Sequence, residues 1–124
     1  MPAKARTEPF ARVRDAAAHL PEVEESTSYG TPALKVRGKL MARMKDSGTL
    51  VVLCPVEEKE MLMEVDPGIY FETDHYKGWP AVLVRLGKIG KSQLRHRLEQ
   101  AWRHRAPRRL VAQFDARTAE RGRN

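Results

Sequence analysis

The chain has 124 residues, of which 41% are hydrophobic and 31% charged, a composition typical of a single soluble domain. Its longest apolar run, Leu50 to Val56, is far shorter than the roughly 20 residues of a membrane-spanning helix, so no membrane partner is expected. Twenty-three Lys and Arg against 16 Asp and Glu give a formal charge of +7, which favours an anionic partner.

The N-terminal segment predicts an amphipathic helix over residues 8–20. Phe10, Val13 and Leu20 recur at helical spacing, Thr7 is available as the N-cap, and Pro21 ends the run. One domain is expected over residues 1–124, with residues 1–6 and 119–124 frayed.

Alternating residues predict strands in the next third of the chain. Residues 23–29 are typical of a polar strand that ends at Gly30. Leu34 and Val36 then alternate with Lys35 and Arg37, and after Gly38 the residues Leu40, Ala42 and Met44 alternate with Met41, Arg43 and Lys45. These strands would have one apolar and one basic face. The turn at 46–48 leads into the apolar strand 49–54.

The pattern in the second half of the sequence predicts two helical regions, with a pair of strands between them. Pro55 opens a short acidic helix over 56–65, and strands are expected over 69–73 and 81–86. Ser92 could cap a last regular helix whose apolar stripe includes Trp102, which we interpret as a core residue. Pro107 interrupts this helix before a shorter continuation. The pattern predicts an α+β two-layer sandwich with a mainly antiparallel sheet of five or six strands.

Three runs in this order carry a family resemblance: SYGTPALKVRGKLMAR (28–43), DPGIYFETDHYKGWPAVLVRL (66–86) and LEQAWRHRAPRRL (98–110). They resemble the MmcQ/YjbR family of small bacterial proteins, and the resemblance covers about residues 20–110. It implies a YjbR-like, CyaY-like α+β fold in the order α-β(3)-α-β(2)-α. It also implies DNA binding, and it brings no catalytic residue.

Charge is distributed in blocks along the chain. Residues 35–45 hold five bases and no acid, residues 57–74 hold seven acids and one lysine, and residues 85–109 hold nine bases against Glu99. Basic side chains on one sheet face and on the last helix could contact phosphates, chiefly those of the backbone. The candidate nucleic-acid-binding residues are Lys35, Arg37, Lys39, Arg43, Lys45, Arg85, Lys91, Arg95, Arg103, Arg105, Arg108 and Arg109.

A second candidate is a polar pocket in the stretch Thr73 to Pro80. It would use Thr73, Asp74, His75, Tyr76 and Trp79, with Asp74 orienting the imidazole for acid–base work. Adjacent residues of an extended strand point to opposite faces, so Asp74 and His75 cooperate only if the loop bends. The alternative interpretation is that this stretch specifies a turn.

Other chemistries fit the sequence poorly. The four His residues and the lone Cys54 lack zinc-ligand spacing, so neither a metal nor another cofactor is expected. The segment ending in Gly90-Lys91-Ser92 lacks the first glycine of a phosphate-binding loop, because Arg85 stands there. With one cysteine and no secretory pattern at the N-terminus, a reducing cytoplasm is expected.

Three functions therefore remain. The first is a non-catalytic DNA-binding protein, or one that binds another polyanion. The second is a protein-interaction or chaperone-like module, such as a homodimer in which the acidic helix meets a basic block of a second copy. A small-ligand pocket at His75 and Tyr76 is a third, weaker alternative.

Overall fold

The structure is a computed structural model that describes residues 2–123. Met1 and Asn124, the outermost residues of the segments predicted to fray, lie outside the described residues, and the rest of both segments is helical. The elements are α1 (Pro2–Ala16), β1 (Val23–Ser28), β2 (Thr31–Val36), β3 (Lys39–Asp46), β4 (Thr49–Leu53), α2 (Val56–Val65), β5 (Tyr70–Phe71), the 3-10 helix η1 (Asp74–Tyr76), β6 (Ala81–Arg85), α3 (Lys91–Arg105) and α4 (Arg108–Arg123).

The six strands form one antiparallel sheet in the order β1-β2-β3-β4-β6-β5, which confirms the predicted α+β class. Four strands precede α2, whereas the family resemblance implied three. The additional strand is the polar segment predicted at 23–29, which pairs with β2 along its whole length. Two helices, not one, follow the sheet.

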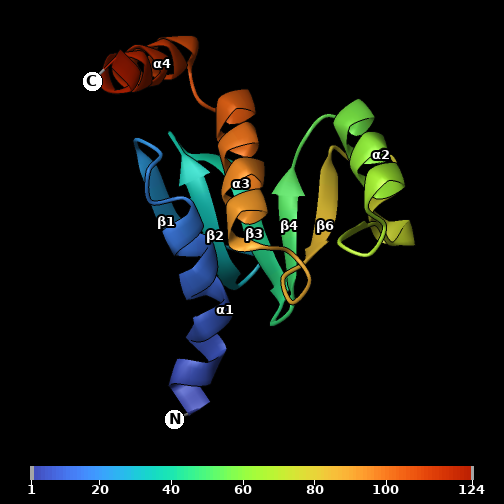
Figure 1. The fold of residues 1–124 in the computed structure, drawn as a ribbon. Helices are drawn as coiled ribbons and strands as arrows, with labels where there is room; N and C mark the ends of the chain where they lie inside the picture. Colours follow the sequence, from blue (N-terminus) through green and yellow to red (C-terminus); the bar gives the residue numbers. More distant parts are fainter. Residues whose placement is uncertain (1, 124) are drawn as a thin grey trace.

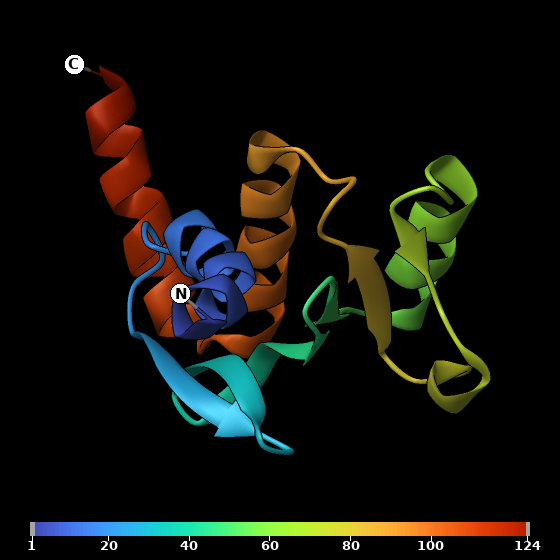
Figure 2. The ribbon, with the colours of Figure 1, turned by 90° about the horizontal axis from the view of Figure 1, so that it is seen from below.

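Helices cover one face of the sheet and leave the other largely open. Figure 1 shows α1, α2 and α3 in front of the strands, and the contacts place α3 on β3 and β4, α1 beside α3, and α2 against β5 and β6. In Figure 1 α4 lies above the strands, past the C-terminal end of α3, and in the view from below in Figure 2 it projects toward the same side of α3 as α1. The main core lies between the sheet and these helices, and Trp102 at its centre has 0% exposure, as predicted for a core residue.

Two short turns determine which residues stand at the hairpin tips. Tyr29–Gly30 joins β1 to β2 and Arg37–Gly38 joins β2 to β3, and all four residues have positive φ. Two consecutive residues with positive φ define the type I′ turn, whose twist matches that of the flanking strands and which favours glycine at its second position. Tyr29 is therefore presented at an exposed tip.

A register shift between β2 and β3 changes which β3 residues face the core from those that the alternation predicts. Leu34 pairs with Ala42 but Lys35 pairs with Leu40, so Met41 is an extra residue in β3. Such a bulge reverses the faces of the residues that precede it. Met41 therefore packs in the helix-side core, and Leu40 lies on the open face beside Arg43, opposite to the prediction for both Met41 and Leu40.

The helix boundaries also differ from the predicted ones. α1 begins at Pro2, upstream of Thr7, and Gly90 rather than Ser92 occupies the N-cap of α3. The continuation after Pro107 is a full helix rather than a short one, because Leu110 is buried and Val111 and Phe114 pack against the main core. Within the described residues no helix is long and apolar enough to cross a membrane.

Candidate functional site

Three of the predicted basic residues lie on the open face of the sheet. Their cross-strand partners are Leu40 for Lys35, Val51 for Arg43, and Thr49 for Arg85. Residues that pair across antiparallel strands point to the same side, and Val51 belongs to the small apolar cluster on that side. The open face thus carries basic side chains beside an apolar cluster, and Arg43 lies directly across from that cluster.

Arg43 and Arg85 are held by aromatic and oxygen partners. Arg43 donates a hydrogen bond to the Tyr76 hydroxyl, and its guanidinium lies 5.0 Å from the centre of the Tyr29 ring. Arg85 lies 3.9 Å from the centre of the Phe71 ring. These contacts fix the side chains without neutralising them, so both arginines keep their charge on the open face.

Arg37 and Lys45 depart from the predicted basic face. Arg37 sits in the β2–β3 turn with φ +51°, and its Nε lies 2.5 Å from a carboxylate oxygen of Glu22. Lys45 falls at a second register shift, between Met44 and Asp46. A turn and a bulge both break the alternation that the prediction assumed.

Basic residues from two segments far apart in the sequence meet along one edge of the molecule, at the β2–β3 turn and the α3–α4 junction. Arg105 Nε donates to the Leu40 carbonyl at 3.1 Å, and Arg37 and Arg109 line one hollow of about 470 Å³. We call this group the basic edge, and its members are Arg37, Lys39, Arg105, Arg108 and Arg109. Arg108 and Arg109 are also the first residues of α4, where the helix dipole adds positive potential.

Most of the predicted bases have uncompensated charge. Among the residues that the structure describes, no carboxylate lies within 4 Å of ten of them: Lys35, Lys39, Arg43, Lys45, Arg85, Lys91, Arg95, Arg105, Arg108 and Arg109. Lys91 and Arg95 are exposed at the start of α3, at the opposite end of that helix from Arg105. They lie apart from the basic edge.

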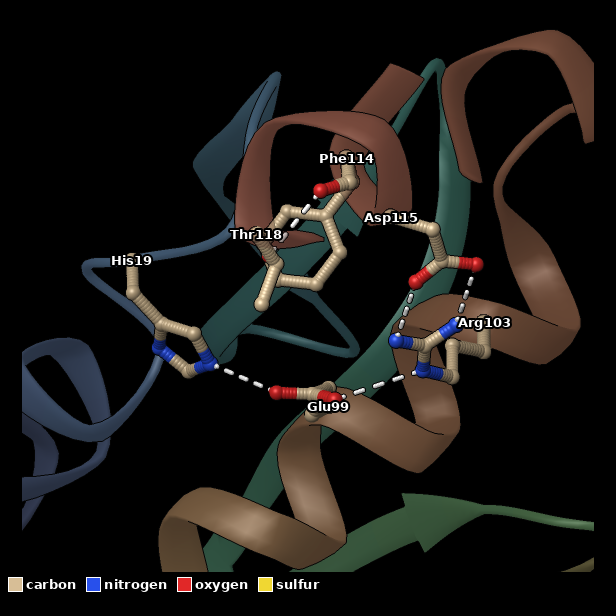
Figure 3. Close-up of polar contacts among 6 residues, drawn as sticks. All are labelled: His19, Glu99, Arg103, Phe114, Asp115 and Thr118. Atoms are coloured by element: carbon tan, nitrogen blue, oxygen red, sulfur yellow. Dashed lines mark hydrogen bonds and ion pairs between the residues drawn. The ribbon is translucent and has the colours of Figure 1, made fainter. Parts of the chain in front are cut away.

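Arg103 takes part in an ion-pair network that joins α3 to α4 (Figure 3). Its guanidinium contacts Glu99 at 3.3 Å and Asp115 at 2.8 Å, and Glu99 also lies 3.1 Å from His19 Nε2. The chain between α1 and β1 is thereby linked to α3 and α4. Phe114 packs in the same place, with its ring edge-on to Trp102 at 5.0 Å. Arg103 therefore serves to dock α4.

The Arg103–Asp115 pair predicts an acid-sensitive contribution to the stability of α4. The hydrogen bond from Arg103 lowers the pKa of Asp115. A carboxyl with a lowered folded-state pKa stabilises fully above its unfolded value, about 3.9, and this contribution is lost as pH falls through the folded value. The free energy of unfolding of Asp115→Asn should lie below that of the parent at pH 6, and the two should converge below pH 4. Glu120→Gln, on the exposed end of α4, is the control and should show no such convergence.

The Thr73 to Pro80 stretch is built around a buried ammonium group. Lys59, on α2, is 1% exposed, and its Nζ donates to the carbonyls of Tyr76 at 2.7 Å and Trp79 at 3.1 Å. A carboxylate oxygen of Glu72 lies 2.7 Å from the same nitrogen. The ammonium thus has two hydrogen-bond acceptors and one ion-pair partner around it. The loop bends, as η1, because it wraps around this charge.

The bend brings His75, Tyr76 and Trp79 to one cavity of about 440 Å³ on the open face, which we call the open-face cavity. Tyr29, Leu40, Arg43, Val51, Leu53 and Ala81 complete its lining. Thr73 and Asp74 are exposed and do not line it, so the predicted pairing of Asp74 with His75 is not formed. The basic group that faces the cavity is Arg43.

Sequence reasoning missed Lys59, Tyr29 and the role of Arg43 in this cavity. One available signal was that Lys59 lies three residues before the buried Leu62, on the inward side of the acidic helix. No local pattern connects Tyr29 with the residues around position 76. The cavity exists because the β1–β2 turn, the strands β3 and β4 and the η1 loop meet in space.

The cysteine is buried, and the described histidines do not gather with other potential metal ligands. Burial raises the pKa of Cys54 to about 11, which keeps the thiol protonated and poorly nucleophilic at neutral pH. Across residues 2–123 there is no group of three or more His, Cys, Asp or Glu side chains that could hold a metal ion. The chemistry offered by the site is that of basic and aromatic side chains.

Two uncharacterized mycobacterial proteins are similar to part of the chain. The uncharacterized proteins Mb2600 of Mycobacterium bovis and Rv2570 of Mycobacterium tuberculosis are each 45% identical to the chain over 56 residues, which is 45% of this chain and 43% of theirs. The chain thus matches less than half the length of these relatives.

A solved structure and a family model extend the comparison. The crystal structure of Deinococcus radiodurans protein DR2400, with the domain DUF419, superposes with a TM-score of 0.63 at 19% identity, over 75% of each chain, and shows the shared fold. The YjbR family model matches residues 18–104, which include every strand, α2 and nearly all of α3. The chain belongs to the YjbR family.

Proposed function

We propose that this protein binds nucleic acid, with DNA as the first candidate, through contacts between the basic edge and the phosphate backbone, and that it does so without catalysis. The observation that carries the proposal is the meeting of two basic segments, 35–45 and 85–109, at the β2–β3 turn and the α3–α4 junction. Phosphates bound there would release counterions, so affinity would fall as salt rises.

Two further features support a backbone contact. Arg presents a planar fork of donors that matches two phosphate oxygens, and Arg108 and Arg109 are exposed. They stand at the start of α4, where the first backbone N–H groups of a helix have no partner within the helix. Such a surface attracts the phosphates of a nucleic acid whatever its base sequence.

Two triple variants with the same net charge test whether binding depends on the position of the basic residues or on net charge alone. The variant Lys39→Glu with Arg108→Glu and Arg109→Glu changes the basic edge, and Lys88→Glu with Lys91→Glu and Arg95→Glu changes exposed bases near the other end of α3. Each triple lowers the formal charge from +7 to +1. At 0.15 M salt charges are screened beyond about 8 Å, and ten residues of α3, roughly 15 Å, separate Arg95 from Arg105.

We expect the edge variant to bind duplex DNA at least about tenfold more weakly, with a salt slope reduced by about two to three, since each lost phosphate contact removes about 0.9. The second triple should retain most of the affinity. Fluorescence anisotropy between 0.05 and 0.2 M salt measures both quantities. No binding of the parent at low salt, or an equal loss in both variants, contradicts the proposal.

A second candidate function is salt-sensitive self-association. The outer side of α2 carries exposed Glu57, Glu60 and Glu64 together with Met61, 53% exposed, and Val65, 77% exposed. This acidic, partly apolar surface complements the basic edge of a second copy. Sedimentation at two salt concentrations distinguishes the functions, because a dimer that dissociates in salt and ignores DNA favours the interaction module. Charge reversal at Glu57, Glu60 and Glu64 should then abolish the dimer.

A further inference from the structure

The open-face cavity has an aromatic rim and an apolar floor. Tyr29 is 89% exposed and Trp79 is 60% exposed, and both line this cavity. Leu40, Val51 and Leu53 form its floor. Large aromatic side chains are usually buried, so two exposed rings on one cavity indicate a surface that is covered by something flat and apolar.

The rim is held in place before any ligand binds. Lys59 fixes the backbone on both sides of Lys77 through the Tyr76 and Trp79 carbonyls. Tyr29 stands in a two-residue turn, and the Arg43 guanidinium, which also bonds the Tyr76 hydroxyl, lies 5.0 Å from the centre of its ring. Binding to such a rim costs little ordering of the protein.

The chemistry of the lining matches a nucleobase. Every base has a flat face that stacks on Trp or Tyr, and a guanidinium can stack on it or donate to its polar edge. A volume of about 440 Å³ lies within the usual range for small-molecule sites, roughly 300 to 1,000 Å³. A paired base inside a duplex could not enter, because its faces are already stacked.

The cavity adjoins the basic edge at Leu40, which Arg105 contacts. The side chain of Leu40 lines the cavity, and the carbonyl of the same residue accepts the hydrogen bond from Arg105. Leu53 lines both the cavity and a smaller hollow that contains Arg105 and His104. A strand whose phosphates lie on the basic edge would therefore pass directly over the cavity.

We propose that the open-face cavity binds an unpaired base of single-stranded nucleic acid, stacked on Trp79. This inference rests on the proposed function, since the basic edge would hold the adjoining phosphates. It assigns the edge a role in affinity for any strand and the cavity a role in selecting single strands over duplex.

Tryptophan fluorescence tests the inference directly, because the chain has two tryptophans and Trp102 is fully buried. A ten-nucleotide thymidine oligomer should quench the solvent-exposed emission of Trp79, and an abasic oligomer of the same length should leave it unchanged. Trp79→Ala should weaken binding of the thymidine oligomer about 5- to 150-fold, the range for one stacked base, and change duplex binding less than twofold. Trp79→Phe should keep most of the affinity.

The outcomes separate this inference from the proposed function. Equal affinity of Trp79→Ala and the parent for the thymidine oligomer, or equal quenching by the abasic oligomer, overturns the cavity assignment even if the edge variant loses DNA. Quenching by adenosine monophosphate at the affinity of the oligomer also overturns it, because the ligand would then be a free nucleotide. Quenching by the oligomer that survives the edge triple would leave the cavity assigned and remove the proposed role of the edge.

Discussion

Replacing Lys59 by methionine is expected to lower the free energy of unfolding by about 3 kcal/mol. Methionine fills similar space but leaves two carbonyls and the Glu72 carboxylate without their donor. Breaking a buried ion pair in this way costs about 3–5 kcal/mol, and we expect the lower end because Glu72 remains 22% exposed and can be hydrated. Urea unfolding monitored by circular dichroism measures the change.

The same substitution should loosen the η1 loop more than the rest of the chain. Amide hydrogen exchange should rise over residues 72–80 while α3 keeps its protection. Lys77→Met is the matched control, because Lys77 lies in the same loop but is exposed. A loss below about 0.5 kcal/mol for Lys59→Met, or an equal loss for Lys77→Met, would show that the buried ammonium does not hold the loop.

Trp102→Ala is expected to cost about 3–5 kcal/mol, the usual range for deleting a large buried aromatic side chain. Trp102 is fully buried, and its indole N–H donates to the Pro21 carbonyl at 3.0 Å. Its ring also meets Phe114, so the substitution removes support for α4 as well as core volume. Thermal and urea unfolding should both report the loss.

A conservative variant keeps this prediction measurable if the alanine variant does not fold. Trp102→Phe retains most of the apolar contact and loses the hydrogen bond to Pro21, so about 1–2 kcal/mol is expected. Trp79→Ala, at the open rim of the cavity, should change stability by less than about 0.5 kcal/mol. The prediction fails if alanine substitutions at Trp79 and Trp102 lower the free energy of unfolding equally.

The strands of the sheet could be predicted because their signals lie within short segments of the sequence. Leu34 and Val36 alternate with polar residues, and the two glycines at positions 30 and 38 mark the hairpins. The bulge at Met41 could not be predicted, since one extra residue leaves the sequence pattern of each strand plausible in either register. That single residue decides whether Leu40 faces the core or the cavity.

The site could be predicted only in part because its members come from distant segments. The loop containing His75 and Tyr76 was recognised from its sequence, but its partners Lys59, Arg43 and Tyr29 lie 17 to 47 residues away. The Arg103–Asp115 pair shows the opposite error, since a basic side chain that looks available in the sequence is engaged by an acid on α4. The sequence shows where the basic residues are, whereas only the fold shows which of them have an acidic partner.

The order of strands in the sheet also bears on how the protein avoids aggregation. The outermost strands are β1 and β5, and unpaired backbone along such strands can template pairing with a second molecule. β1 carries Glu24 and Glu25 in a polar run, and β5 is two residues long. Carboxylates repel a like-charged copy and a two-residue strand offers little to pair with, so the sheet discourages its own extension into fibrils or stacked oligomers.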